Sequence, residues 1–206
     1  MIADDTMIQE AIQELERRGG VVRMKFRPDQ TLFDSGNEAA GTYWMRQGQV
    51  KLESIDSGGK THFLHVMTGS RVLGLGAYLF NRPHPYHARA LGEVSVIWLD
   101  RVNTRKFMEE HPKVMESLMR QLGEELELLE NRLRSAYSLD AVERVFETIT
   151  YLKKCDTARV WTRTEIAEWA GTTPETVARS IGALRSDGRI ATEGRRITLL
   201  RKKLLN

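Results

Sequence analysis

Seven apolar residues recur from residue 115 to residue 136 at alternating intervals of four and three, and this pattern constrains the fold more than any other feature. They are Met115, Met119, Leu122, Leu126, Leu129, Leu133 and Ala136. A 3.5-residue repeat sustained over about three heptads predicts one long helix with an apolar seam along it. The seam can pack on the chain's own core or on a second copy of the helix. Charged residues flank the seam, and they favour a parallel two-stranded coiled coil.

Before this helix the pattern changes to short runs of strand-forming residues, separated by turns rich in Gly, Pro, Asn and Asp. The runs cover residues 21–26, 31–33, 43–45, 50–55, 61–67, 72–73, 86–91 and 95–99. Strands this short and this evenly spaced predict a small antiparallel barrel or roll. Apolar spacing over residues 5–18 predicts a helix in front of the roll, which ends at Gly19-Gly20.

The charge is unevenly distributed along the chain. Residues 139–206 hold 13 Lys and Arg against 9 Asp and Glu, whereas residues 1–138 hold 18 against 19. A basic C-terminal third points to a polyanionic partner such as nucleic acid, with an ordinary solvated surface as the alternative.

Cysteine content and hydropathy exclude several other classes of protein. The one cysteine, Cys155, excludes an intramolecular disulfide framework, a cysteine-only zinc site and a four-cysteine iron–sulfur cluster within one chain. No apolar run reaches the roughly 18 residues of a membrane span, and the first residues lack the apolar region of a signal peptide. We therefore expect a cytoplasmic protein with no membrane contact.

Residues 162–184 have the pattern of two helices joined by a tight turn. The first helix is expected over residues 164–170, and Gly171 supplies the backbone freedom that the turn needs. Thr173 is expected to cap the second helix, with Pro174 at its first position. Together these signals predict a helix-turn-helix.

Elements on both sides of this pair extend it to a winged helix. Asp140 is expected to cap a helix over residues 141–152, after a hinge at Ser138-Leu139-Asp140. A hairpin with Gly194 near its turn follows the second helix, in the place of a wing that usually contacts phosphates.

The second helix of the pair presents polar residues outward, and these are the candidates for reading DNA bases. Its outward face carries Glu175, Thr176, Ala178 and Arg179. An arginine can donate two hydrogen bonds to guanine O6 and N7, and a glutamate can accept one from cytosine N4. Glu175 and Arg179 are four residues apart, so an ordinary ion pair between them is the alternative interpretation.

The order of roll, long helix, Asp hinge and winged helix resembles the CRP/FNR family of bacterial transcription regulators. The most specific stretch is residues 162–190, which contain Thr-Arg-x-Glu-Ile-Ala and Gly-x-Thr-x-Glu-Thr-Val-x-Arg. The resemblance implies an α+β fold with three parts. These are an antiparallel β-roll of the cyclic-nucleotide-binding type (residues 1–110), a long dimerisation helix (111–138) and a C-terminal winged helix-turn-helix (139–206).

The resemblance also implies partners and residue roles. It implies a homodimer joined by the long helix and bound to palindromic double-stranded DNA, with RNA polymerase as a further partner and transcription activation as the outcome. The implied base-reading residues are Glu175 and Arg179, with Ala178 beside them; the implied phosphate contacts are Thr162, Arg163, Thr173 and Thr176. Pro174 stands where catabolite-type members have a further guanine-reading arginine, so that contact should be missing. A repressor acting by occlusion, or a regulator acting through a protein partner, is the alternative function.

The effector pocket of the family is degenerate in this chain. Members that bind cyclic nucleotides use a glutamate after a glycine, an arginine–serine pair, and a threonine and serine of the long helix. The corresponding residues here are Gly74 with Leu75, Tyr86 with His87, and Leu129 with Glu130. A phosphate without its arginine is costly to bury, so we expect no response to cyclic AMP.

Other effectors stay open at this stage. Histidines at 62, 65, 84 and 87 could bind a metal or haem. Residues 81–88 weakly resemble a regulator that senses 2-oxoglutarate. Cys155 could act as a redox switch. None of these has a complete ligand set, so we expect no metal and no cofactor, and the small-molecule effector is unidentified. The chain has no nucleophile–base set and no phosphate loop, so we expect no enzyme activity.

Overall fold

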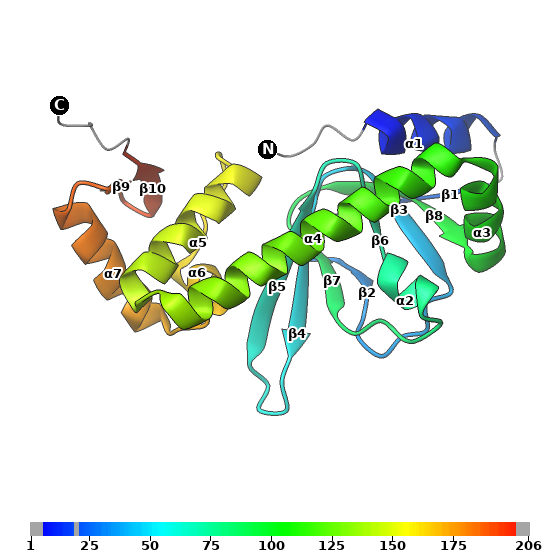
Figure 1. The fold of residues 1–206 in the computed structure, drawn as a ribbon. Helices are drawn as coiled ribbons and strands as arrows, with labels where there is room; N and C mark the ends of the chain where they lie inside the picture. The colour runs from blue at the N-terminus through cyan, green and yellow to red at the C-terminus, as the bar shows by residue number, and fades with distance from the viewer. Residues whose placement is uncertain (1–5, 19–20, 201–206) are drawn as a thin grey trace. The chain divides into compact units, whose positions relative to one another are not determined.

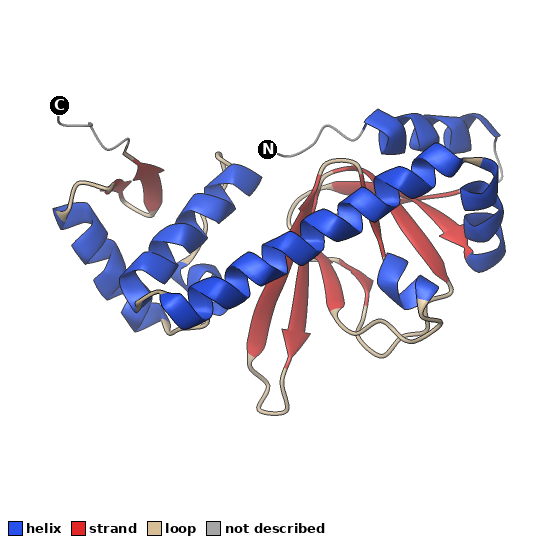
Figure 2. Cartoon of the chain, in the orientation of Figure 1, coloured by secondary structure: helices blue, strands red, loops and turns tan. Residues whose placement is uncertain are grey.

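The computed structural model describes residues 6–18 and 21–200 of the chain. The chain divides into two compact units: one comprises residues up to 127 except 61–63, and the other comprises residues 61–63 and those from 128 on. Figure 1 labels the elements in chain order, and Figure 2 distinguishes helices from strands.

The first unit, together with residues 61–63 at the start of β5, forms a roll of two four-stranded antiparallel sheets. One sheet has the order β1 (Val22–Phe26), β8 (Val94–Asp100), β3 (Gly41–Gln47) and β6 (Arg71–Leu73). The other has the order β2 (Thr31–Phe33), β7 (His87–Ala90), β4 (Gln49–Ile55) and β5 (Thr61–Thr68). All eight predicted runs form strands, so the predicted antiparallel roll is confirmed.

Helices cover the sheet that contains β3. They are α1 (Thr6–Arg18), α3 (Arg101–Glu110) and the first part of α4 (Pro112–Ser138). Their apolar faces pack around Trp44, which is fully buried, and the ring of Phe107 meets the Trp44 ring edge-on at 5.4 Å. A further short helix, α2 (Leu75–Leu79), follows β6 and was not expected from the sequence.

A buried glutamine fixes α4 against the edge strand β6. The side-chain amide of Gln121 donates to the carbonyl oxygen of Val72 (2.9 Å), and its Oε1 accepts from the N–H of Val72 (3.0 Å). An edge strand exposes unpaired backbone groups, and buried ones must find partners. Gln121 therefore completes β6 as a further strand would, and this fixes which face of α4 meets the roll.

The second unit contains the predicted winged helix-turn-helix. Its elements after α4 are α5 (Ala141–Cys155), α6 (Arg163–Ala170), α7 (Pro174–Ser186) and the hairpin of β9 (Ile190–Glu193) with β10 (Arg196–Leu199). The core between them consists of Val145, Ile149, Leu152, Ile166, Val177, Leu184 and Ile190. Asp140 caps α5 as expected, because its Oδ1 accepts from the N–H groups of Val142 (2.8 Å) and Glu143 (2.9 Å).

An arginine ties the hairpin to α5. Both terminal nitrogens of Arg189, just before β9, donate to the carboxylate of Glu143, and the guanidinium lies 3.9 Å from the ring centroid of Phe146. A two-point ion pair over an aromatic face restrains both side chains. Among the described residues, no helix is long and apolar enough to cross a membrane.

Candidate nucleic-acid interface

The first helix of the pair, α6, begins in a complete capping box. Thr162 Oγ1 accepts from the N–H of Glu165 (3.1 Å), and Glu165 Oε2 accepts from the N–H of Thr162 (2.8 Å). This reciprocal arrangement satisfies N–H groups that the helix itself leaves unpaired. Gly171 ends α6 with φ of 63°, a left-handed conformation that glycine adopts without strain.

The second helix, α7, is anchored by one apolar face. Thr173 is its N-cap, with Oγ1 accepting from the N–H of Thr176 (3.3 Å), and Pro174 occupies the first position. Val177 and Leu184 are fully buried among α5 and α6. The opposite face, with Glu175 and Arg179, is therefore presented to solvent.

The two candidate base-reading side chains of α7 do not pair with each other. Arg179 Nη2 donates to Thr176 Oγ1 (3.2 Å) and not to the carboxylate of Glu175. The backbone N–H of Glu175, helped by the charge of Arg179, holds the pKa of the Glu175 carboxyl below its ordinary value. The Glu175 carboxyl is thus charged at neutral pH; both side chains are exposed, while Ala178 beside them is half-buried.

A groove of about 700 Å³ lies between the start of α6, α7 and the hairpin. Three exposed arginines line it, namely Arg163, Arg185 and Arg195, together with Thr162 and Thr192. On α7 the wall includes two small residues, Ala178 and Gly182, beside the larger Ile181 and Arg185. Sequence reasoning named Arg163 and Thr162 but missed Arg185, Thr192 and Arg195. Thr192 and Arg195 lie in the hairpin that the sequence predicts as a wing, and this was the only sequence signal for them.

The residues implied as phosphate contacts differ in whether their side chains already make hydrogen bonds within the protein. Arg163 is exposed and has its guanidinium available at the groove. The hydroxyls of Thr173 and Thr176, in contrast, bond to one another (3.3 Å), and Thr176 also accepts from Arg179. Both threonine side chains are therefore used inside α7.

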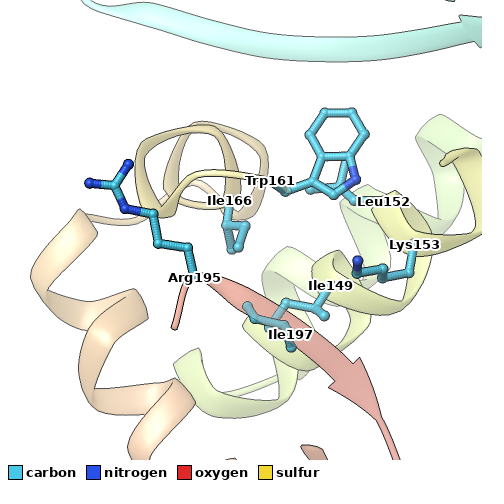
Figure 3. A pocket seen from close by; sticks show the side chains of 7 residues that line it. All are labelled: Ile149, Leu152, Lys153, Trp161, Ile166, Arg195 and Ile197. Carbon is cyan, nitrogen blue, oxygen red and sulfur yellow. The ribbon is translucent and has the colours of Figure 1, made fainter. Parts of the chain in front are cut away.

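A second pocket under the hairpin is too small for a ligand. Its volume is about 10 Å³, close to the space of one water molecule. Figure 3 shows apolar side chains around it, among them Ile149, Leu152, Ile166 and Ile197, with the guanidinium of Arg195 directed away from them. The pocket belongs to the core of the winged helix.

In the roll, the residues of the degenerate effector pocket are used for packing. Leu75 is buried in the core with Trp44, and Tyr86 packs against the apolar residues between the sheets, where burial raises its pKa to about 12. The His87 ring bonds through Nδ1 to Asp34 (2.9 Å). Gly74 caps α2 with φ of 79°, and the ring of His84 lies directly beside it.

The remaining pocket candidates lie on the long helix. Leu129 and Glu130 are both exposed on α4, Leu129 with 52% of its surface accessible. Within the described ranges 6–18 and 21–200, no three His, Cys, Asp or Glu side chains gather closely enough to hold a metal ion.

The predicted heptad seam divides into two parts. Met115 and Leu122 are half-buried against the core of the roll. The exposed members are Met119 (62%), Leu126 (58%), Leu129 (52%), Leu133 (59%) and Ala136. Part of the seam therefore packs on the chain's own core, and part is left uncovered by the residues that the structure describes.

Comparison with known proteins matches both units. The family model of the cyclic nucleotide-binding domain matches residues 23–111, and that of the Crp-like helix-turn-helix domain matches residues 143–206. The anaerobic regulatory protein of Pasteurella multocida is 25% identical, over 91% of this chain and 72% of that protein. The fumarate and nitrate reduction regulatory protein of Escherichia coli is 24% identical, over 90% of this chain and 78% of its own. These relatives are regulatory proteins, so the expectation that the chain is not an enzyme is confirmed.

Solved structures share the fold. The global regulator CLP of Xanthomonas campestris, described as responsive to c-di-GMP, superposes with a TM-score of 0.81 at 16% identity, covering 96% of this chain and all of that one. FixK2 from Bradyrhizobium japonicum gives a TM-score of 0.73 at 22% identity, covering 89% of this chain and 94% of its own. With both family models in the expected order and regulators as relatives, the chain belongs to the CRP/FNR family of DNA-binding transcription regulators.

Proposed function

We propose that the chain works as a homodimer that reads a palindromic DNA site through α7 and activates transcription without needing cyclic AMP. The observation that carries this proposal is that Glu175 and Arg179 are exposed and make no ion pair with each other, on a helix anchored by its opposite face. A guanidinium that makes no ion pair with its neighbour can donate both of its parallel N–H groups to guanine O6 and N7.

The groove beside α7 fits the DNA backbone. Arg163 and Arg195 line it from α6 and from the hairpin, and Arg185 lines it from α7. Phosphate contacts position a protein on DNA without reading sequence, and their number sets the salt dependence of binding. In this proposal the groove holds one strand's phosphates while the face with Arg179 reads bases.

The uncovered part of the heptad seam supports a homodimer. Leu126, Leu129 and Leu133 are each more than half exposed and follow one another along α4. Contiguous apolar surface of this kind is rare on monomers, and a parallel copy of the same helix would bury it. A two-fold axis along the helices implies an inverted-repeat site with half-sites about one helical turn apart.

The packing inside the roll supports independence from cyclic AMP. The positions that would contact the nucleotide carry Leu75 in the core, Tyr86 between the sheets and His87 bonded to Asp34. Another basic residue of this segment, Arg89, donates to Glu53 (2.9 Å) and to the carbonyl of Asp29 (3.0 Å). An arginine engaged in this way cannot grip a phosphate without losing those bonds.

Activation requires a surface for RNA polymerase, and the β4–β5 hairpin is the candidate. Its tip is ordered by Asp56, whose Oδ1 accepts from the N–H groups of Gly58 (2.9 Å) and Lys60 (3.0 Å). Run-off transcription with purified polymerase tests this step: more transcript on adding the protein is expected, and less transcript would identify a repressor.

Selection from a random DNA library tests the whole proposal. The full chain at moderate salt is expected to enrich an inverted repeat, with and without cyclic AMP at equal affinity. If no sequence is enriched, the chain does not read DNA in this way. If enrichment requires cyclic AMP, the interpretation of the roll is wrong.

A further inference from the structure

A short chain of hydrogen bonds runs along the exposed face of α7 and ends at Arg179. The hydroxyl of Thr173 donates to Thr176 Oγ1 (3.3 Å), and Arg179 Nη2 donates to the same oxygen (3.2 Å). Thr173 is itself fixed as the N-cap, since it accepts from the N–H of Thr176 (3.3 Å). The guanidinium is thus connected to the rigid start of the helix through one hydroxyl oxygen.

The spacing along the helix explains why Thr176 is the partner. Residues three and four apart are neighbours on a helix surface, so Arg179 can reach either Thr176 or Glu175. The Glu175 carboxylate accepts instead from its own backbone N–H, at the end of the helix where negative charge is favoured. Glu175 is held toward the N-terminus, and Thr176 is left as the acceptor for Arg179.

A restrained arginine binds differently from a free one. A free arginine side chain occupies many rotamers, and docking on one base pair costs that freedom. A hydrogen bond that already holds the guanidinium lowers this cost for the base that fits the held position. It gives no such help to the other bases, so it increases discrimination.

We propose that Thr176 is a positioning residue for Arg179, which orients the guanidinium before DNA binds and so sets base selectivity without contacting a base. This inference rests on the proposed function. It replaces the phosphate contact that the family resemblance implies for Thr176.

Two substitutions separate the hydroxyl from the rest of the side chain. Thr176→Val keeps the branched shape and removes the hydroxyl, whereas Thr176→Ser keeps the hydroxyl. Both keep the backbone N–H that Thr173 caps, so the start of α7 is preserved. Ser186→Ala is the matched control, because the Ser186 hydroxyl lies on the same helix and donates to the carbonyl of Gly182 (3.1 Å), not to Arg179.

The DNA experiment measures affinity of the full chain for its selected site and for the site with each other base at the pair that Arg179 reads. Thr176→Val is expected to reduce discrimination at that pair about three- to tenfold, as fits one lost hydrogen bond, while Thr176→Ser and Ser186→Ala retain it. In an Arg179→Ala background, Thr176→Val should cause no further loss. An equal loss on all sequences, additive with Arg179→Ala, would indicate a phosphate contact and overturn the proposal.

A measurement without DNA keeps this proposal distinct from the proposed function. The heteronuclear NOE of the Arg179 Nε–Hε group reports side-chain order in the free protein. We expect it to fall in Thr176→Val and to stay unchanged in Thr176→Ser and Ser186→Ala. An unchanged NOE in Thr176→Val overturns the positioning role even if the chain selects no DNA sequence at all.

Discussion

The ring of His84 lies against Gly74, so that a Cβ on Gly74 would meet His84 Cε1 at 3.0 Å. The same ring stacks on Phe33 with centroids 3.8 Å apart, and His84 is almost fully buried. Burial lowers the pKa of His84 and keeps its ring neutral. The loop before β7 therefore inserts a buried side chain directly beside Gly74.

This contact predicts that Gly74 cannot carry a side chain. Gly74→Ala is expected to lower the free energy of unfolding by about 1–3 kcal/mol, because φ is +79° and the new methyl group meets a packed ring. Urea denaturation measures the loss. Gly76→Ala is the control, since no atom lies within 4 Å of a Cβ there, and it should be neutral. Equal stability of the two variants would contradict the packing described.

The exposed part of the seam predicts the oligomeric state. Leu126→Glu places a charge in the proposed dimer contact, and we expect the dimer dissociation constant to rise at least about a hundredfold. Sedimentation equilibrium measures it. Val102→Glu introduces the same charge on α3, at a position that is 76% exposed and outside the seam, and should leave the dimer intact. A wild-type chain that sediments as a monomer would refute the proposed coiled coil.

The two kinds of DNA contact predict different mutant behaviour. Arg179→Ala is expected to cost about 1–3 kcal/mol at one base pair and to relax specificity there. Arg163→Ala and Arg195→Ala, at the groove, should weaken binding to all sequences alike and lower the salt slope by about one unit each. Titrations at several salt concentrations distinguish them. If Arg179→Ala behaves like Arg163→Ala, the assigned roles are wrong.

The environment of Cys155 predicts an unreactive thiol. Burial raises its pKa to about 11, although a hydrogen bond with Tyr151 acts in the opposite direction. At pH 7.5 only about one molecule in a few thousand then carries the reactive thiolate. Labelling with a thiol reagent should be slow in the folded protein and fast in urea. Rapid labelling of the folded chain would contradict this prediction and support a redox switch at Cys155.

Local signals in the sequence were enough to predict the elements. Turn residues mark the ends of the eight strands, and Gly171, Thr173 and Pro174 mark the helix-turn-helix because each has a backbone conformation or a cap that the turn requires. The short helix α2 escaped prediction because Gly74 begins it without any capping side chain.

Contacts between distant residues could not be predicted in this way. Gln121 completes β6 across 49 positions, and no local pattern distinguishes this glutamine from an exposed one. Arg163 and Arg195 line the same groove only because the fold brings these distant residues together. The spacing of Glu175 and Arg179 allowed both an ion pair and base reading. In the structure Arg179 bonds to Thr176 and not to Glu175, although the Thr176 hydroxyl was expected to contact a phosphate.

The capping box of α6 predicts a pH-dependent stability. Burial alone would raise the pKa of the Glu165 carboxyl, but hydrogen bonds from the N–H and hydroxyl of Thr162 and from Arg159 (2.9 Å) together lower it. A carboxyl whose pKa is lower in the folded state stabilises the fold at every pH above its unfolded value of about 4.3. That stabilisation is lost as the pH falls through the folded value.

Glu165→Gln separates this charge from the cap. Glutamine can keep the reciprocal hydrogen bond to Thr162 through its amide oxygen, but its NH2 group stands in place of the oxygen that accepts from Arg159. We expect the unfolding free energy to drop by about 1–2 kcal/mol between pH 6 and 8, because the charge-assisted hydrogen bond from Arg159 is lost. Below about pH 4 the difference from wild type should shrink, since the wild-type carboxyl is then being protonated as well. Arg159→Gln removes the ion pair from the other side and should weaken the pH dependence in urea denaturation without abolishing it, because Thr162 still donates to Glu165. A difference that stays constant down to pH 3 would mean that Glu165 acts by shape alone.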